Sequence, residues 1–195
     1  MKLLLVESPA KAHTISKMLG KEYTVRATLG HVIDLPEKRL GVDVDNGFSA
    51  TYVPIAGRGE KILRELRSLA DKASVVLLAS DPDREGEAIA WHLRRALAKN
   101  KADYPRFRRV TYNQSTRSAI AEAVAHPHDI DENLFNAQQM RRVLDRIIGY
   151  KSSPLLWRQV KGAYSAGRVQ TVGLRLLCER EDAIDAFEPK KYGVS

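Results

Sequence analysis

Four carboxylates, at positions 81, 83, 85 and 87, lie close together in the segment SDPDREGE at residues 80–87. An apolar run at residues 75–79 precedes the segment and predicts a buried strand, and a helical pattern follows from residue 88. Acids at the carboxyl end of such a strand lie where open α/β sheets bind their ligands. Because neighbouring negative charges repel one another, the pattern indicates a hard cation with oxygen ligands, Mg²⁺ first.

The same segment could instead be the start of a helix. Asp and Glu favour the first helical turn because the free amides and the helix dipole stabilise negative charge there. Ser80 with Asp83 resembles a capping box, although Glu or Gln is the usual fourth residue. From this segment alone both interpretations stay open, but its acids are denser than one cap requires.

A further carboxylate, Glu7, stands in the same kind of position. The segment KLLLV at residues 2–6 predicts a strand that ends at Glu7, with Ser8 as the N-cap and Pro9 as the first residue of a helix. Two parallel strands that end in acids can bring those acids to one sheet edge, and Lys11 would lie in the helical turn beside it. The alternative is that Glu7 is a lone, exposed residue at a strand end.

Composition limits the classes of protein that fit. The 195 residues suffice for one large or two small domains. The single cysteine, Cys178, excludes an intramolecular disulfide and a cysteine-rich zinc site. No apolar run approaches the roughly 20 residues of a membrane span, and no signal peptide follows Met1. A cytoplasmic protein with no membrane partner is expected.

The net charge of +8 is concentrated in one part of the chain. Residues 138–178 contain a single acid, Asp145, and eight basic residues: Arg141, Arg142, Arg146, Lys151, Arg158, Lys161, Arg168 and Arg175. So uneven a distribution favours contact with a nucleic-acid backbone. A solvated charged surface is the alternative.

Strand and helix patterns alternate along the first two thirds of the chain. Strands are predicted at 2–7, 23–29, 50–55, 74–80 and 107–112, and helices at 9–19, 58–72, 85–99 and 115–125. This order favours a mostly parallel sheet covered by helices, with a loop at 30–49. There is no P-loop and no G-x-G-x-x-G, so nothing supports a nucleotide cofactor.

Between Pro127 and about residue 187 only helices are predicted. We expect one from about residue 131 to Ile148, with Gly149 after its end, a short one opening at residues 153–154, and a long one at 168–187. Residues 192–194 suggest a further strand, and the chain is expected to continue in a longer protein.

Five segments, in this order, resemble the bacterial type IA DNA topoisomerases. They are LVESPAKA at 5–12, GHVIDLP at 30–36, residues 80–93, NAQQMRRVLDR at 136–146 and SAGRVQ at 165–170. The resemblance spans nearly the whole chain.

The resemblance implies an α/β, Rossmann-like Toprim domain at 1–115, a connecting helix and linker at 116–130, and the incomplete start of a helical, strand-binding domain at 131–195. It implies Mg²⁺ as cofactor, with Glu7, Asp81, Asp83 and Glu85 as metal ligands. It assigns catalytic roles to Glu7, Lys11, Asp83 and Arg168. The residues implied to touch DNA are His31, Arg141, Arg142, Asp145, Tyr150, Trp157, Gly162, Ala163, Tyr164, Ser165, Ala166, Gly167, Arg168 and Gln170.

Taken alone, two of these have other interpretations. Trp157 follows two leucines and could belong to a core, whereas an exposed Trp could stack on bases. His31 by itself would more often be a structural histidine. The family further implies a monomer in the nucleoid that acts on single-stranded or underwound DNA, relaxing negative supercoils without ATP.

Two departures from the family pattern matter. Gln114 and Ser115 replace the Glu and Ile of its Phe-Asn-Glu-Ile-Thr motif. None of the seven tyrosines lies in the Thr-Tyr-x-Arg-Thr-Asp context of the family's nucleophile. Two other classes therefore stay open: a Toprim metal-dependent phosphotransferase or nuclease, and a DNA-binding module without chemistry.

Overall fold

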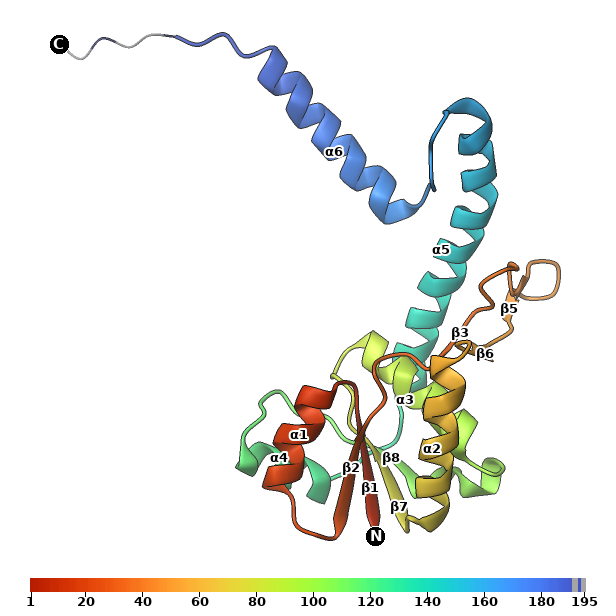
Figure 1. Ribbon diagram of the computed structural model, residues 1–195, viewed down its shortest axis with the longest axis vertical. Coiled ribbons are helices and arrows are strands. Elements are labelled where there is room, and N and C mark those ends of the chain that lie inside the picture. The colour runs from red at the N-terminus through yellow and green to blue at the C-terminus, as the bar shows by residue number, and fades with distance from the viewer. Residues whose placement is uncertain (191–192, 194–195) are drawn as a thin grey trace. The chain divides into compact units, whose positions relative to one another are not determined.

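The computed structural model describes residues 1–190 and 193 (Figure 1). The chain forms two compact units, Met1–Arg141 and Arg142–Ser195. The expected strand at 192–194 falls largely outside the described residues. Within the described part of the chain, no helix is both long and apolar enough to cross a membrane.

Four parallel strands form the central sheet of the first unit. They are β1 (Lys2–Val6), β2 (Tyr23–Ala27), β7 (Val75–Leu78) and β8 (Phe107–Arg109), in the order β2-β1-β7-β8. β1 lies centrally, with Leu4 level with Val25 on one side and Leu77 on the other. The predicted parallel α/β architecture is confirmed, and the carboxyl ends of all four strands meet at one edge.

Helices cover both faces of this sheet (Figure 1). Successive strand residues point to opposite faces, so Leu3 and Leu5 pack under α2 (Arg58–Lys72) and α3 (Arg84–Leu97). Leu4 and Val6 pack on the other face, under α1 (Pro9–Met18) and α4 (Arg117–Ala125). Because both faces are buried, the strands read as continuous apolar runs.

Side-chain caps begin three of these helices. Ser8 Oγ accepts from the Lys11 amide at 3.3 Å, as predicted, and Thr116 caps α4 in the same way. Asp83 Oδ1 caps α3, accepting from the Gly86 amide at 2.7 Å. The expectation that Ser80 would cap this helix was wrong, because its hydroxyl donates to the Gly86 carbonyl at 2.6 Å.

The predicted sheet strand at 50–55 is also wrong. This segment forms two short strands, β5 (Ser49–Ala50) and β6 (Val53–Pro54), outside the central sheet. β5 pairs antiparallel with β4 (Val42–Asp43), and β6 pairs antiparallel with β3 (Ile33–Asp34). Both partner strands lie within the segment 30–49 that was expected to be a loop. Pro54 has no amide to donate, which suits a short edge pairing rather than a central strand. A 3₁₀ helix, η1 (Lys101–Arg106), was not predicted.

Two helices follow β8 and α4 towards the end of the chain. The first, α5 (Glu132–Gln159), is continuous, so the predicted end before Gly149 was wrong. Gly149 does not have the positive φ of a helix-ending glycine, and the helix also continues through Pro154. The second, α6 (Arg168–Asp185), agrees with its prediction to within two residues at its end.

Candidate active site

Glu7, Lys11 and Asp81 converge at the carboxyl edge of the sheet, where the adjacent strands β1 and β7 end. The Asp81 amide donates to Glu7 Oε1 at 2.8 Å. Lys11, one turn into α1, pairs with the Asp81 carboxylate and lies 3.8 Å from Glu7 Oε2. The predicted meeting of two strand-end acids is therefore present, with an ammonium group between them.

The electrostatics of this group favour a cation between the acids. Partial burial lowers the pKa of Lys11, but the hydrogen bond and charge of Asp81 and the charge of Glu7 outweigh burial, so this pKa is raised. Lys11 thus carries a full positive charge at neutral pH, which offsets one of the two carboxylate charges within its reach.

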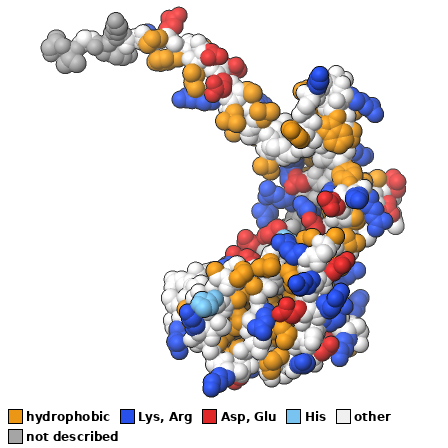
Figure 2. Space-filling model, in the orientation of Figure 1, with side chains coloured by type: hydrophobic (Ala, Val, Ile, Leu, Met, Phe, Trp, Pro, Cys, Tyr) orange, Lys and Arg blue, Asp and Glu red, His pale blue; other side chains and the backbone are white. Residues whose placement is uncertain are grey.

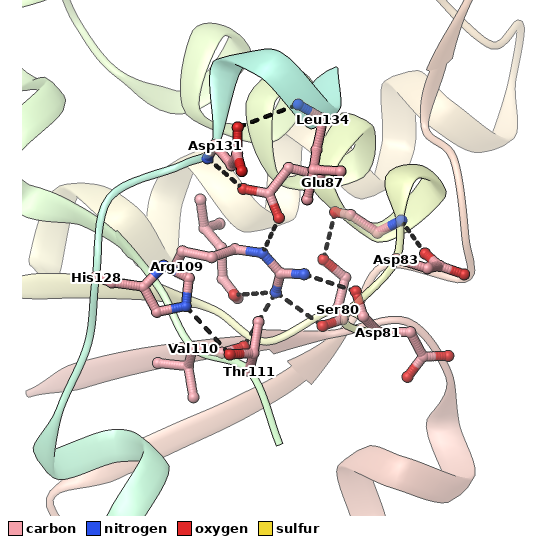
Figure 3. Close-up of polar contacts among 12 residues, drawn as sticks. Ser80, Asp81, Asp83, Glu87, Arg109, Val110, Thr111, His128, Asp131 and Leu134 are labelled. Carbon is pink, nitrogen blue, oxygen red and sulfur yellow. Dashed lines mark hydrogen bonds and ion pairs between the residues drawn. The ribbon is translucent and has the colours of Figure 1, made fainter. Parts of the chain in front are cut away.

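The backbone of the Ser80–Asp81 turn is held from three sides (Figure 3). Ser80 is buried, and its hydroxyl bonds to the first turn of α3. Arg109 Nη1 donates to the Ser80 carbonyl at 2.7 Å, and Arg109 Nη2 donates to the Asp81 carbonyl at 2.6 Å. Gly86 packs so closely on Asp81 that a Cβ there would lie 2.1 Å from the Asp81 carbonyl oxygen. The turn is therefore preorganised before any ligand binds.

Two of the other three acids of the segment, Asp83 and Glu85, have different partners. The Asp83 carboxylate caps α3. Glu85 Oε1 lies 2.5 Å from His31 Nε2, and Glu85 Oε2 accepts from Gln138 at 3.1 Å. Glu85 and His31, both predicted site residues, are thus brought together.

In the second unit, a cavity of about 630 Å³ gathers most of the predicted DNA-contacting residues. The lining includes Arg142, Asp145, Tyr150, Trp157, the segment 165–168 and Gln170. Asp145 Oδ1 lies 2.5 Å from Arg168 Nε, and the Asp145 hydrogen bond raises the pKa of this guanidinium. Arg146, which the prediction omitted, also lines the cavity, with its guanidinium 4.7 Å from the Tyr150 ring centre.

Two contacts hold the loop whose residues 165–167 line this cavity. Trp157 Nε1 donates to the Tyr164 carbonyl at 2.7 Å. The Ser153 hydroxyl accepts from the Ala166 amide at 3.1 Å. Tyr164 itself is 93% exposed and Trp157 is 57% exposed, so neither ring belongs to a core. Hydrophobic side chains also lie exposed along α6 (Figure 2).

Comparisons with known proteins agree with both units. Residues 2–114 match the model of the Toprim domain, and residues 129–194 match a DNA topoisomerase model. The solved structure of full-length topoisomerase I from Thermotoga maritima is 47% identical, with a TM-score of 0.82 over 97% of this chain. The chain belongs to the bacterial type IA DNA topoisomerases. It spans 32% of the length of the T. maritima chain.

The Toprim domain of this topoisomerase chain has carboxylate oxygens, from Glu7 and Asp81, that are suitable ligands for a metal ion. No three His, Cys, Asp or Glu side chains are grouped to hold an ion anywhere in the described residues. Glu7 and Asp81 already hold one cation, the Lys11 ammonium, between them. Mg²⁺ commonly uses only one or two carboxylates and completes its shell with water and substrate phosphates. The pair fits that mode of binding, whereas a four-carboxylate cage is not assembled.

The remaining predicted residues of the topoisomerase chain are spread over both units. Arg141 and Arg142 are exposed on α5, while Gly162 and Ala163 lie in the loop before α6. Gly162 has a φ of +82°, a left-handed conformation that favours glycine. Sequence reasoning missed Arg109 and the burial of Glu87. The available signal was weak, because the strand predicted at 107–112 contains two arginines, Arg108 and Arg109, and nothing in the sequence distinguishes the buried one.

Proposed function

We propose that this chain supplies one part of an enzyme that relaxes negatively supercoiled DNA without ATP. The enzyme would cut one strand transiently, forming a phosphotyrosine, pass DNA through the break and reseal it. The convergence of Glu7, Lys11 and Asp81 at the sheet edge carries this proposal. It offers an ammonium for a phosphate oxygen next to a carboxylate that can exchange a proton.

Lys11 and Glu7 have the most direct roles in this reaction. The Lys11 ammonium would stabilise negative charge on the scissile phosphate, because a preorganised cation is most effective where charge develops. Glu7 would give or take the proton of the sugar hydroxyl. The Asp81 amide would orient the Glu7 carboxylate for this step. Asp83 and Arg168 are the other proposed catalytic residues, and Arg168 would bind DNA phosphate.

Mg²⁺ is the proposed metal, since carboxylate oxygens suit a hard cation. Glu7 and Asp81 would hold it, and Asp83 and Glu85 would contribute only after leaving their present partners. When bound, the ion would neutralise and orient the DNA phosphate. Lys11 would then be released from Asp81.

The attacking tyrosine is expected from a part of the enzyme beyond these 195 residues. Tyr112 lies close enough to Glu7 and Asp81 to feel their charges, but burial raises the pKa of its phenol despite the opposing charge of Lys11. It also donates to the Ala79 carbonyl at 3.5 Å. A neutral, hydrogen-bonded phenol is a poor nucleophile, so Tyr112 is not assigned this role.

Single-stranded or underwound DNA is the proposed partner of the second unit. Its cavity combines arginines, which suit phosphates, with exposed aromatic rings, which suit unstacked bases. His31 and Arg141 of the first unit are proposed as additional contacts. We further propose a monomer that acts in the cytoplasm at the nucleoid.

Relaxation of a negatively supercoiled plasmid by the full-length enzyme, with Mg²⁺ and no ATP, tests the proposal. Glu7→Gln and Lys11→Met should each reduce the rate at least a hundredfold, and Lys17→Met, an exposed change on the same helix, should not. Unchanged rates in the first two variants would refute these roles. Cleavage of oligonucleotides by the 195-residue chain alone would favour a nuclease. If the enzyme relaxes no plasmid and its affinity for DNA is the same in both variants as in the unmodified protein, a DNA-binding module without chemistry would be favoured.

A further inference from the structure

Arg109, at the end of β8, is completely buried and has no assigned role. Its side chain is 0% exposed, and its Nε donates to Glu87 Oε2 at 2.8 Å. The rest of its guanidinium donates to four backbone carbonyls, those of Leu78, Ser80, Asp81 and Val110, at 2.6–3.0 Å (Figure 3). Two of these carbonyls belong to the turn that carries Asp81.

Glu87 continues this network to the beginning of α5. The residue is 3% exposed, and while Oε2 binds Arg109, Oε1 accepts from the Asp131 amide at 2.7 Å. The Asp131 carboxylate in turn accepts from the Asn133 and Leu134 amides at 2.8 and 3.1 Å. One buried ion pair therefore joins the acidic turn, α3 and the first turn of α5.

The chemistry of this position requires arginine. An unpaired buried charge is strongly unfavourable, so Arg109 is tolerated only because Glu87 neutralises it and carbonyls satisfy its donors. A planar guanidinium presents five N–H groups in a fixed arrangement, whereas a lysine ammonium has three on a single atom. Lysine could neutralise Glu87 but could not hold both carbonyls of the turn at the same time.

We infer that Arg109 is a positioning residue, which fixes the Ser80–Asp81 backbone and, through Glu87, ties it to the first turn of α5. The carboxylate of Asp81 is thereby held next to Glu7 and Lys11. The same ion pair sets the start of the helix on which Arg141 lies. The inference deepens the proposed function and rests on it, since the turn matters for catalysis only if Asp81 does.

Arg106 provides a matched control at the other end of the same strand. It also binds a carboxylate, that of Asp103, and donates to two backbone carbonyls, Ala70 and Ala73, at 2.7 and 2.6 Å. It precedes β8, so it lies at the edge of the sheet opposite the acids. Arg106→Lys removes an arginine clamp of similar chemistry without touching the acidic turn.

Site-resolved amide hydrogen exchange in the 195-residue chain tests the inference. Arg109→Lys should speed exchange at the Asp81 and Gly86 amides at least tenfold beyond any change in global unfolding, and at the Asp131 amide by less, because Glu87 still accepts from that amide. Arg106→Lys should speed exchange at the Ala73 amide and leave those three unchanged. Equal effects of the two variants at the acidic turn would overturn the inference.

If Arg109→Lys does not fold, the double variant Arg109→Met with Glu87→Gln removes both charges together. The side-chain carbonyl of the introduced glutamine keeps an acceptor for the Asp131 amide, so only the Asp81 and Gly86 amides should exchange faster. Unchanged exchange at both amides would overturn the inference.

Titration with Mn²⁺, followed by the electron paramagnetic resonance signal of the free ion, gives a second measurement. A general loss of stability would not change the metal affinity of the folded chain. Affinity should fall at least threefold in Arg109→Lys, compared at equal folded fraction, and stay unchanged in Arg106→Lys. Unchanged affinity in both variants would overturn the positioning role. No Mn²⁺ binding by the unmodified chain would instead count against the proposed function, and the exchange rates would still decide the role of Arg109.

Discussion

The side chain of Glu7 accepts a hydrogen bond from the backbone amide of Asp81, 74 residues further along the chain, at 2.8 Å. This contact exists because β1 and β7 are adjacent parallel strands that end at the same edge. It leaves the Asp81 carboxylate for Lys11. The three side chains are therefore coupled, so that removing the charge of one changes the electrostatic environment of the other two.

Lys11 should compete with a divalent cation for Glu7 and Asp81. In Lys11→Met the two carboxylates lose their ammonium, so Mg²⁺ or Mn²⁺ should bind several-fold more tightly, as calorimetry would measure. Stability at low salt should fall by about 1 kcal/mol, since the pair is only partly buried. Lys17→Met should change neither quantity, and weaker metal binding in Lys11→Met would contradict the competition.

Gly86 should not tolerate the smallest side chain. An alanine would normally stabilise a helix by up to about 1 kcal/mol relative to glycine. At Gly86, however, the new Cβ would lie 2.1 Å from the Asp81 carbonyl oxygen, so Gly86→Ala should lower the free energy of unfolding by roughly 1–3 kcal/mol. Gly173→Ala, a helical position with nothing within 4 Å, should cause no loss. Urea denaturation of the two variants measures the difference.

Sequence patterns were most informative where the local signal and the tertiary environment agree. The strand ending at Glu7 and its Ser8-Pro9 helix start follow from local rules and were predicted correctly. Gly149 was misread because a glycine ends a helix only if it adopts a left-handed conformation, which depends on how the next residues pack. Glycine and proline lower helix propensity without dictating an end.

The sequence predicts which residues belong to the candidate site better than it predicts which of their side chains contact one another. Alternating strands and helices imply that Glu7 and Asp81 share an edge, but side-chain partners depend on tertiary detail. The pairing of Glu85 with His31 joins positions 54 residues apart. The role of Arg109 depends on the burial of Glu87, which looks like one more exposed helix-start acid in the sequence.

His92 should make the first unit less stable in mild acid. Burial among aromatic rings lowers the pKa of this histidine to about 4. The unfolded chain binds a proton near pH 6.5 and the folded chain does not, so stability is full above pH 6.5 and falls as pH drops towards 4. The loss should approach about 3 kcal/mol, on the scale of 1.36 kcal/mol per pKa unit.

A His92→Gln variant isolates this effect. The Tyr52 ring lies 4.4 Å from the His92 ring, so the variant should be less stable at pH 7 through lost packing. Between pH 6.5 and 4.5, however, its stability should fall less steeply than that of the unmodified chain. Nearby charges on His31, Asp34 and Arg95 also act on His92, so the comparison is best made at fixed ionic strength. Parallel pH profiles of unfolding would contradict the assignment.

Trp157 should support DNA binding by holding the loop before α6 and by offering a ring to a base. Trp157→Phe keeps an aromatic ring but loses the 2.7 Å bond to the Tyr164 carbonyl, one neutral hydrogen bond of about 1 kcal/mol. Affinity for a short single-stranded oligonucleotide should therefore fall about threefold to tenfold, measured by fluorescence anisotropy. Leu155→Ala, an exposed change on the same helix outside the cavity, should have no effect.

Salt dependence distinguishes this role from a phosphate contact. Each phosphate contact with single-stranded DNA contributes about 0.7 to the slope of log affinity against log salt. Arg142→Gln should reduce that slope by about this amount because it removes a cation from the cavity. Trp157→Phe should lower affinity equally at every salt concentration, since it changes no charge. A reduced slope in Trp157→Phe would show that the loop positions the arginines rather than the bases.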